Sequence, residues 1–243
     1  METELYSSVK LWLWTAFVQY TAPMARALHS AVGGSTRRSN GNRPSDELLL
    51  DAARDVFDLT GYHATSMEAI AERANSTKPT LYAHFGSKER LYRAALEREA
   101  GKLRGWLFEA YESAAGLPME EQVRADMLAF FHYATEHPSG FGLLFGDTAS
   151  GPAAEVRDDL MQSISGQIAV RIRAYYTQRK LPPPAQSAEL LASMLAGIAI
   201  HGGRQALALS LPPADVGEFA TALAHAGLQH LAPAQMEMID RQG

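Results

Sequence analysis

Residues 65–88 read TSMEAIAERANSTKPTLYAHFGSK, and this stretch predicts two short helices joined by a tight polar turn. Thr65 and Glu68 stand at capping-box spacing, in which the threonine oxygen accepts a first-turn amide proton and the glutamate reaches back. Behind this cap, apolar side chains recur at helical spacing at Met67, Ile70, Ala71 and Ala74. Residues 75–77 carry turn chemistry, and Pro79 suits the first turn of a second helix. A short turn followed by a helix with an exposed polar face is the arrangement by which helix-turn-helix proteins read the DNA major groove.

Polar and cationic side chains gather on and beside the second predicted helix. Leu81 and Phe85 are four residues apart and are expected to face inward. The candidates for DNA contact are Thr65, Ser66, Ser76, Thr77, Lys78, Pro79, Thr80, Tyr82, His84 and Lys88. Among them, Lys78, Thr80 and His84 are the candidates for base edges, because lysine can donate to guanine and threonine can contact a thymine methyl group.

Three of these candidates also have plain structural explanations. Thr65 can be only a helix cap, Tyr82 only a half-buried packing residue, and Lys88 only a solvated charge. A cation is unfavourable at the N-terminus of a helix, where Lys88 is expected to stand, so a phosphate partner is the better explanation of this lysine. A phosphate at the helix N-terminus is likewise favoured for Thr65.

The same residues resemble a known family. The run from about Glu47 to Leu96 closely resembles the DNA-binding domain of TetR-family transcriptional repressors, with TLYAHFGSKE at residues 80–89 as its core. The Tyr-x-His-Phe-x-x-Lys spacing and the upstream Gly-Tyr-x-x-Thr turn are a specific signal, and both occur here. The resemblance covers about a fifth of the chain. It implies a phosphate contact for the hydroxyl of Tyr82, a dimer, and a ligand-binding C-terminal part.

The composition is compatible with a DNA-binding protein once the charge is divided along the chain. The chain has 243 residues, enough for one large or two modest domains, and no cysteine, which removes disulfides and cysteine zinc sites and fits a cytoplasmic location. The net charge is −5, but residues 94–243 hold eleven Lys and Arg against seventeen Asp and Glu, whereas residues 37–93 hold nine against eight. Within the latter, acids crowd the first predicted helix at Asp46, Glu47, Asp51, Asp55 and Asp58.

Residues 1–43 are predicted to be an N-terminal extension and basic linker, poorly ordered, and Met24 is an alternative start. The apolar run at residues 11–18 is far shorter than the roughly 20 residues of a membrane span, so no membrane association is expected. The alternative is a short amphipathic helix that docks on the body of the protein or on a partner. The basic residues of the linker are interpreted either as an arm along the DNA or as solvated charges: Arg37, Arg38 and Arg43.

The remainder predicts helices and no strands, so the fold class is all-α. An N-terminal three-helix helix-turn-helix DNA-binding domain is expected at residues 44–92, and a C-terminal helical ligand-binding and dimerisation domain at residues 93–243. A short apolar segment is expected at residues 141–145, after a break at residues 137–140. The other helices are predicted at residues 46–60, 89–111, 123–135, 153–178, 186–210 and 215–231.

The last two predicted helices are apolar around more of their circumference than a surface helix should be. Our hypothesis is a homodimer through a four-helix bundle, as in the resembled family, which suits a palindromic DNA operator. The alternative is that these helices only cover the core of their own chain. Small residues on them permit close helix approach: Ala188, Ala192, Gly197, Gly202 and Gly203.

An effector pocket in the C-terminal domain is implied by the resemblance, and its occupants are expected among large side chains of the middle helices. The alternative is ordinary core packing, which is the more frequent role of such side chains at helical spacing. We expect a hydrophobic effector. The candidates are Trp106, Phe130, Tyr133, Phe141, Phe145, Met161, Arg171, Tyr175 and Met194.

The sequence contains no Gly-rich phosphate loop, nucleophile elbow or His-Glu-x-x-His site, so an enzyme is not expected, and no catalytic residue, metal site or cofactor is predicted. We expect a ligand-responsive transcription regulator, a repressor that binds an operator as a dimer and is released by a small effector. The alternatives are a DNA-binding regulator without an effector, and a helical interaction protein that uses the helix pair for protein contacts.

Overall fold

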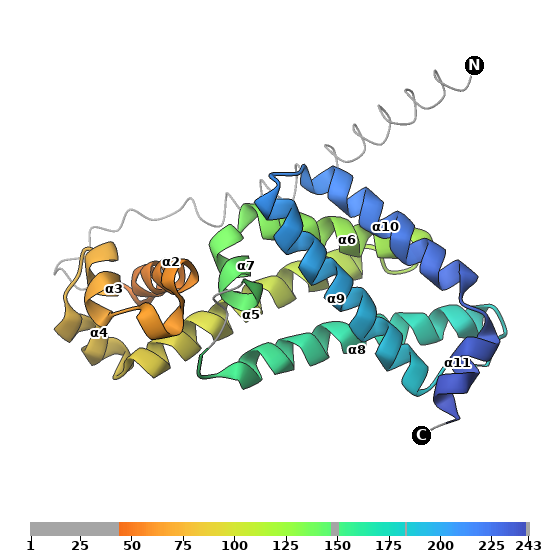
Figure 1. The fold of residues 1–243 in the computed structure, drawn as a ribbon, viewed down its shortest axis with the longest axis horizontal. Helices are drawn as coiled ribbons and strands as arrows, with labels where there is room; N and C mark the ends of the chain where they lie inside the picture. Colours follow the sequence, from red (N-terminus) through yellow and green to blue (C-terminus); the bar gives the residue numbers. More distant parts are fainter. Residues whose placement is uncertain (1–43, 147–150, 183, 242–243) are drawn as a thin grey trace, which may run out of the picture. The chain divides into compact units, whose positions relative to one another are not determined.

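The structure is a computed structural model that describes residues 44–146, 151–182 and 184–241 of the chain. Residues 44–243 form one compact unit. The predictions for residues 1–43 and for the loop at residues 147–150 lie outside the described residues. In the part of the chain that is described, every regular element is a helix, which confirms the all-α prediction (Figure 1).

Three helices form the N-terminal part of this unit: α2 (Asp46–Ala64), α3 (Met67–Arg73) and α4 (Lys78–Phe85). Each begins at a hydroxyl side chain that accepts a backbone amide of the first turn, at Ser45, Ser66 and Thr77. Gly61 interrupts α2 with a φ of 74°, a backbone conformation that L side chains rarely adopt. The predicted glycine turn after the first helix is therefore confirmed.

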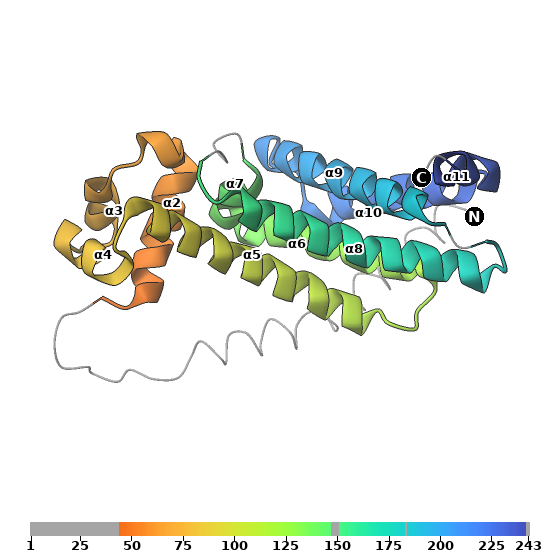
Figure 2. The same cartoon turned by 90° about the horizontal axis from the view of Figure 1, so that it is seen from below.

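The remaining helices begin with α5, which starts beside α4, runs on into the C-terminal part and contacts α6, α7 and α8 there. They are α5 (Lys88–Ser113), α6 (Met119–Glu136), α7 (Pro138–Phe145), α8 (Ala154–Gln178), α9 (Gln186–Ala208), α10 (Pro213–His230) and α11 (Pro233–Asp240). Helix α6 packs along α10, and α8 packs along α9. In Figure 2, α8 lies between α5 and α9, both of which it contacts. Within the described residues, no helix combines the length and apolar character that crossing a membrane requires.

Two helices differ from the sequence-based expectation. Residues 137–140 were expected to break the chain, yet α7 starts at Pro138, and α11 starts at Pro233 where no helix was predicted. Proline is well tolerated at the first position of a helix, because the amide hydrogen that it lacks has no partner there. Each of these two helices therefore begins at a proline, shortly after the preceding helix has ended.

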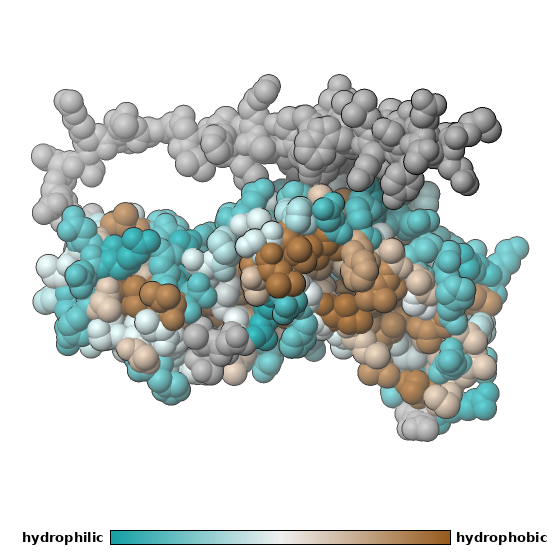
Figure 3. Space-filling view, turned by 45° about the horizontal axis from the view of Figure 1, so that its top comes forward, coloured by the Kyte–Doolittle hydropathy of each residue, from teal (hydrophilic) through white to brown (hydrophobic). Residues whose placement is uncertain are grey.

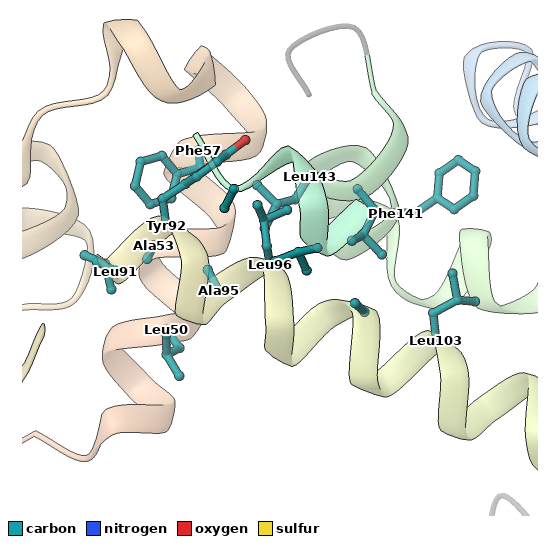
Figure 4. Packing of buried hydrophobic residues seen from close by; sticks show 14 of the residues in the cluster. Leu50, Ala53, Phe57, Leu91, Tyr92, Ala95, Leu96, Leu103, Phe141 and Leu143 are labelled. Atoms are coloured by element: carbon teal, nitrogen blue, oxygen red, sulfur yellow. The ribbon is translucent and has the colours of Figure 1, made fainter. Parts of the chain in front are cut away.

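One hydrophobic core joins the N-terminal helices to the C-terminal ones. Figure 4 shows Phe57 of α2 and Tyr92 of α5 close together, and their ring centroids are 4.8 Å apart in an edge-on contact. Leu96 continues this cluster along α5 toward Phe141 and Leu143 of α7, all of them buried. Because α5 runs through the predicted domain boundary at residues 92 and 93, the core is continuous across it, and the boundary itself stays a prediction.

Candidate nucleic-acid interface

The α3–α4 helix pair is held by its inward face. The backbone amide of Ser76 donates to the carbonyl oxygen of Ala71 at 2.8 Å, and Asn75 takes a φ of 47°, so the chain reverses sharply between the helices. Leu81 of α4 is completely buried in the cluster that contains Ile70 of α3. Helix α4 is therefore anchored from one side, and its other side is presented outward.

Four of the ten predicted DNA-contact residues lie on that outward side. Four exposed residues at the start and on the outer face of α4 are named here the α4 face: Thr77, Lys78, Pro79 and Tyr82. The Tyr82 side chain is 42% exposed, and Lys78 Nζ lies 6.0 Å from the centroid of its ring. Ser66 is also exposed, whereas Ser76 and Thr80 are partly buried. Thr77 accepts the Thr80 amide at 3.3 Å, so the cap both starts α4 and orders its first turn.

The predicted capping box at Thr65 is wrong by one residue. Ser66 is the N-cap of α3, and its Oγ accepts the amide of Ala69 at 3.0 Å. Thr65 is only 4% exposed, and its hydroxyl donates to the carbonyl oxygen of Gly61 at 2.7 Å, so it closes α2 instead of opening α3. A hydroxyl buried in this way is not exposed to a phosphate, so the structure does not support the predicted DNA contact of Thr65.

His84 also turns away from the α4 face. Its Nδ1 pairs with the carboxylate of Asp46 at the start of α2, and its side chain is 15% exposed. It lies two residues after Tyr82, which places it on a different side of the helix. His84 therefore joins α4 to α2 in this structure, and its base contact stays a prediction.

Lys88 begins α5, as the sequence predicted. Ser87 is the N-cap, and Lys88 Nζ lies 4.6 Å from the centroid of the Tyr62 ring and 3.5 Å from the carbonyl oxygen of His63. A cation over an aromatic face is attracted by the negative charge of the π system. The structure thus shows how an ammonium group is tolerated at this helix N-terminus, and the phosphate contact stays a prediction.

Several acidic side chains of α2 pair with arginines within the chain. Arg98 of α5 donates to Asp51 at 2.8 Å, and Asp55 accepts from Arg54 at 2.7 Å and from Arg73 at 2.6 Å. Burial raises the pKa of Asp55, but the hydrogen bonds from the two arginines outweigh it and hold the pKa below its usual value. Helix α2 therefore presents less negative charge to solvent than the number of its acidic residues suggests.

One acid of α3 behaves differently. Glu68 lies outside the capping motif, and its carboxylate pairs with the ammonium group of Lys78 on the α4 face. The sequence did not predict this ion pair, because ten residues separate the partners and only the reversal between α3 and α4 brings them together.

The predicted effector-site residues are divided between separate environments. Five of them join the main core: Trp106, Phe130, Tyr133, Phe141 and Phe145. Their rings contact one another at centroid distances of 6.0 Å for Trp106 and Tyr133, 5.7 Å for Phe130 and Phe141, and 5.3 Å for Phe141 and Phe145. The indole Nε1 of Trp106 donates to the carbonyl oxygen of Ala129 at 2.9 Å. In this structure these side chains pack against one another, which is the core alternative considered above.

The other candidates lie elsewhere. Met161 is partly buried on α8, and Tyr175 packs on a second cluster with Ile172 and Ala188. Met194 is 57% exposed on α9, apart from both clusters, and its place in a pocket stays a prediction.

Arg171 is buried, and its donors are used within the chain. Its guanidinium pairs with Asp126, donates to the carbonyl oxygens of Gln122 at 3.3 Å and Tyr111 at 3.2 Å, and stacks 3.6 Å from the centroid of the Tyr111 ring. This arrangement fits a structural cation that ties α8 to α5 and α6.

The chain is similar to known sequences over a segment that includes α3 and α4. Residues 49–95 match the model of the tetR family, described as bacterial regulatory proteins. Over 135 residues the chain is 38% identical to the HTH-type transcriptional activator FasR of Mycolicibacterium smegmatis, covering 51% of this chain and 61% of FasR. Over 68 residues it is 40% identical to the HTH-type transcriptional regulator RutR of Escherichia coli, covering 28% of this chain and 32% of RutR. The chain thus spans less than two thirds of the length of these relatives.

Solved structures share the fold over more of the chain. A TetR-like transcriptional regulator from Rhodococcus sp. RHA1 is 26% identical with a TM-score of 0.65, covering 79% of this chain and 100% of that one. The regulator FadR of Bacillus subtilis, solved in complex with stearoyl-CoA, is 12% identical with a TM-score of 0.63, covering 74% of this chain and 97% of that one, and shows the fold alone. The segment from α2 into α5 thus carries the match to the tetR family of bacterial regulatory proteins, and most of the chain shares the fold of a TetR-like transcriptional regulator.

Proposed function

We propose that the protein is a DNA-binding transcription regulator that places the α4 face in the major groove of a double-stranded operator. The observation that carries the proposal is the exposure of Lys78 and Tyr82 one helical turn apart, on a helix that is anchored in the core by buried Leu81. A rigid helix with an exposed lysine and a phenol on one side can reach base edges and phosphates together. The phenol of Tyr82 and the ammonium of Lys88 supply phosphate contacts, and Lys78 supplies a base or phosphate contact.

Substitution of Tyr82 or Lys88 tests this interface. We expect Tyr82→Phe and Lys88→Ala each to weaken operator binding about 5- to 30-fold, since a contact to a charged phosphate contributes about 1–2 kcal/mol. Lys88→Ala should also flatten the salt dependence by about one counterion, because one phosphate contact is lost. Fluorescence anisotropy on the intergenic DNA upstream of the protein's own gene, across a salt series, measures both effects.

Arg104→Ala is a matched control, because it removes one exposed positive charge about 24 Å further along α5. It should leave the affinity and the salt slope nearly unchanged. Wild-type protein that selects no genomic fragment, or binds without salt dependence, would remove the proposal and favour a role of the helix pair in protein contacts.

The proposed operator-binding form is a homodimer joined through α9 and α10. Figure 3 shows hydrophobic residues gathered over the C-terminal helices, and the exposed ones recur at four-residue spacing on α9 and α10: Leu190, Met194, Ile198, Phe219 and Leu223. A side-chain carbon added at Gly197 or Gly227 would meet nothing within 4 Å, which leaves room for another helix. Such a large exposed apolar surface is typical of an interface.

The small residues expected at this interface are partly internal. Ala188 and Ala192 are completely buried within the chain, and a side-chain carbon at Gly203 would lie 2.8 Å from the Phe141 ring. For these three positions the alternative, packing on the chain's own core, holds. The dimer hypothesis now rests on the larger residues of the opposite side of α9.

The proposed mode is repression at a palindromic operator, because a two-fold dimer presents one α4 face to each half-site. The similar protein FasR is named an activator. The position of the operator relative to the promoter sets the sign of regulation, and transcript levels of the adjacent genes in a deletion strain decide it. A rise on deletion supports repression, and a fall identifies an activator.

We further propose that a hydrophobic effector acts on the C-terminal helices and that the change reaches α2 through Arg157. This arginine of α8 donates to the carbonyl oxygen of Leu144 at 3.0 Å and to the hydroxyl of Tyr92 at 2.6 Å. The Tyr92 ring contacts Tyr62 at 4.9 Å between centroids, and Lys88 lies over Tyr62. A shift of α8 would therefore be felt at a proposed phosphate contact.

Linkage gives the effector proposal a direct test. Stearoyl-CoA, the ligand in the FadR structure, is a suitable first probe, followed by a panel of hydrophobic acids. An active probe should weaken operator binding, and saturating operator DNA should weaken probe binding by the same factor. Equal probe affinity with and without DNA, or a panel that produces no thermal shift, contradicts this mechanism and supports a regulator without a small-molecule effector.

A further inference from the structure

The pair formed by Glu68 and Lys78 crosses the two helices of the proposed interface. The glutamate side chain on α3 is 62% exposed and the lysine side chain on α4 is 44% exposed, so both face solvent. Glu68 caps no helix, since Ser66 performs that role, and it is not part of the buried core. Its one ion pair among the described residues holds a cation of the α4 face.

The charge state of the pair follows from their contact. The hydrogen bond from Lys78 lowers the pKa of Glu68, and the hydrogen bond to Glu68 raises the pKa of Lys78. Both groups are therefore charged at neutral pH. The carboxylate accepts a hydrogen bond from the ammonium group, as an anionic phosphate oxygen would.

We propose that Glu68 is an internal competitor for Lys78, which holds the lysine in the DNA-free protein and releases it when DNA binds. This inference rests on the proposed function. It adds that an acidic residue limits the affinity for the operator. Release is not costly, because exposed ion pairs contribute little stability. After release the carboxylate stays close to the polyanionic duplex and opposes binding, so the affinity lies below the value that the cations alone would give.

Glu68→Gln removes the negative charge and keeps the shape of the side chain. We expect this variant to bind the operator about two- to fivefold more tightly at low salt, because the interaction free energy of an exposed ion pair is small. The difference should shrink as salt is added, since the effect is electrostatic. Anisotropy on the same duplex across a salt series gives both numbers, and circular dichroism checks that the exposed substitution leaves the fold unchanged.

Two further variants isolate the pair. In the Lys78→Gln background, Glu68→Gln should produce less than half of its gain, because the ammonium group for which the carboxylate competes is gone. Glu72→Gln makes the same change in net charge four residues along α3, at an exposed position, and should have a smaller effect. An equal gain in the Lys78→Gln background would show general repulsion and overturn the proposal.

Weaker binding by Glu68→Gln would also overturn it, since it would make Glu68 a direct contact to the operator. An unchanged affinity would do the same. Each of these results leaves the proposed function intact, because the wild-type protein still binds DNA with a salt dependence. Absence of wild-type binding to any genomic fragment is the separate result that removes the proposed function and, with it, this inference.

Discussion

Phe219→Glu is expected to convert the proposed dimer into a species near 26.5 kDa, the mass of one chain, at micromolar concentration. Phe219 is the most exposed of the apolar residues on α10, at 75%. Aromatic residues near the centre of an interface contribute a large share of the binding energy. Introduction of two carboxylates at a two-fold contact adds desolvation and repulsion, so we expect at least a 100-fold weaker dimer, about 3 kcal/mol.

Operator affinity should decrease when dimerisation is lost. A monomer presents a single α4 face and loses the gain from binding two half-sites at once, which commonly exceeds a factor of 100. Sedimentation velocity measures the mass, and anisotropy on the same samples measures the affinity. Ile198→Glu on α9 should behave similarly if both helices contribute to the interface.

Phe108→Glu is the matched control, because Phe108 is also an exposed phenylalanine, at 58%, but lies on α5. It should leave the mass and the operator affinity nearly unchanged. A Phe219→Glu protein that still sediments as a dimer would place the interface on another surface. Wild-type protein that sediments as a monomer at this concentration would contradict the dimer altogether.

The exposed side of α9 shows why periodicity alone could not assign this surface. The helix is apolar on two sides, one lined by Ala192 and Ala196 and the other by Leu190, Met194 and Ile198. Burial of apolar area favours placing the larger residues inside. The structure buries the alanines because α8 packs closely along that side, and a contact between distant helices cannot be read from spacing within one helix.

The helix pair shows a similar division between what was and was not predictable. The turn, the inward Leu81 and the start of α5 at Lys88 followed from local chemistry. The cap was misplaced because Thr65 and Ser66 are both good capping residues, and Glu68 completes the box only with Thr65. Burial of the Thr65 hydroxyl against the carbonyl of Gly61 decides between them, and it depends on how the chain turns after α2.

Long-range pairs were the least accessible to sequence reasoning. The structure places Asp46 beside His84, a candidate for a base edge, although Asp46 stands 38 residues earlier in the chain. The pairs of Glu68 with Lys78 and of Arg171 with Asp126 have the same character. Charge is visible in a sequence, but the partner of a charge is a property of the fold. Pro138 at the start of α7, by contrast, is a local signal that was interpreted above only as part of a break, and Pro233 starts α11 in the same way.

Arg171→Met is expected to reduce the free energy of unfolding by about 3 kcal/mol near neutral pH, because it leaves the Asp126 carboxylate without its cation. The Arg171 side chain is 8% exposed and that of Asp126 is 27% exposed, so we take the lower end of the range for a broken buried pair. Two carbonyl oxygens, of Gln122 and Tyr111, also lose a donor. Urea unfolding followed by circular dichroism measures the loss.

The loss should depend on pH in a defined direction. Burial raises the pKa of Asp126 to about 6, although Arg171 lowers it in part. A carboxyl whose pKa is higher in the folded state binds more protons when folded, so its contribution to stability is present below the unfolded value, about 4, and is lost as pH rises through the folded value. Without Arg171 the folded pKa rises further, and the loss extends to higher pH. The difference between variant and wild type should therefore be largest near pH 8 and smallest near pH 4, where the carboxyl is protonated in both proteins.

The double variant Arg171→Met with Asp126→Asn separates the stranded charge from lost packing. It removes the carboxylate, so it should recover a large part of the loss near pH 8 and show little dependence on pH. A single variant whose loss is the same at pH 4 and pH 8 would mean that the arginine acts mainly through its stacking on Tyr111 and its bonds to backbone carbonyls. Operator binding by the folded single variant should stay close to wild type, since Arg171 ties α8 to α5 and α6, and a marked loss of DNA affinity at full folding would instead connect this cation to the proposed sensing route.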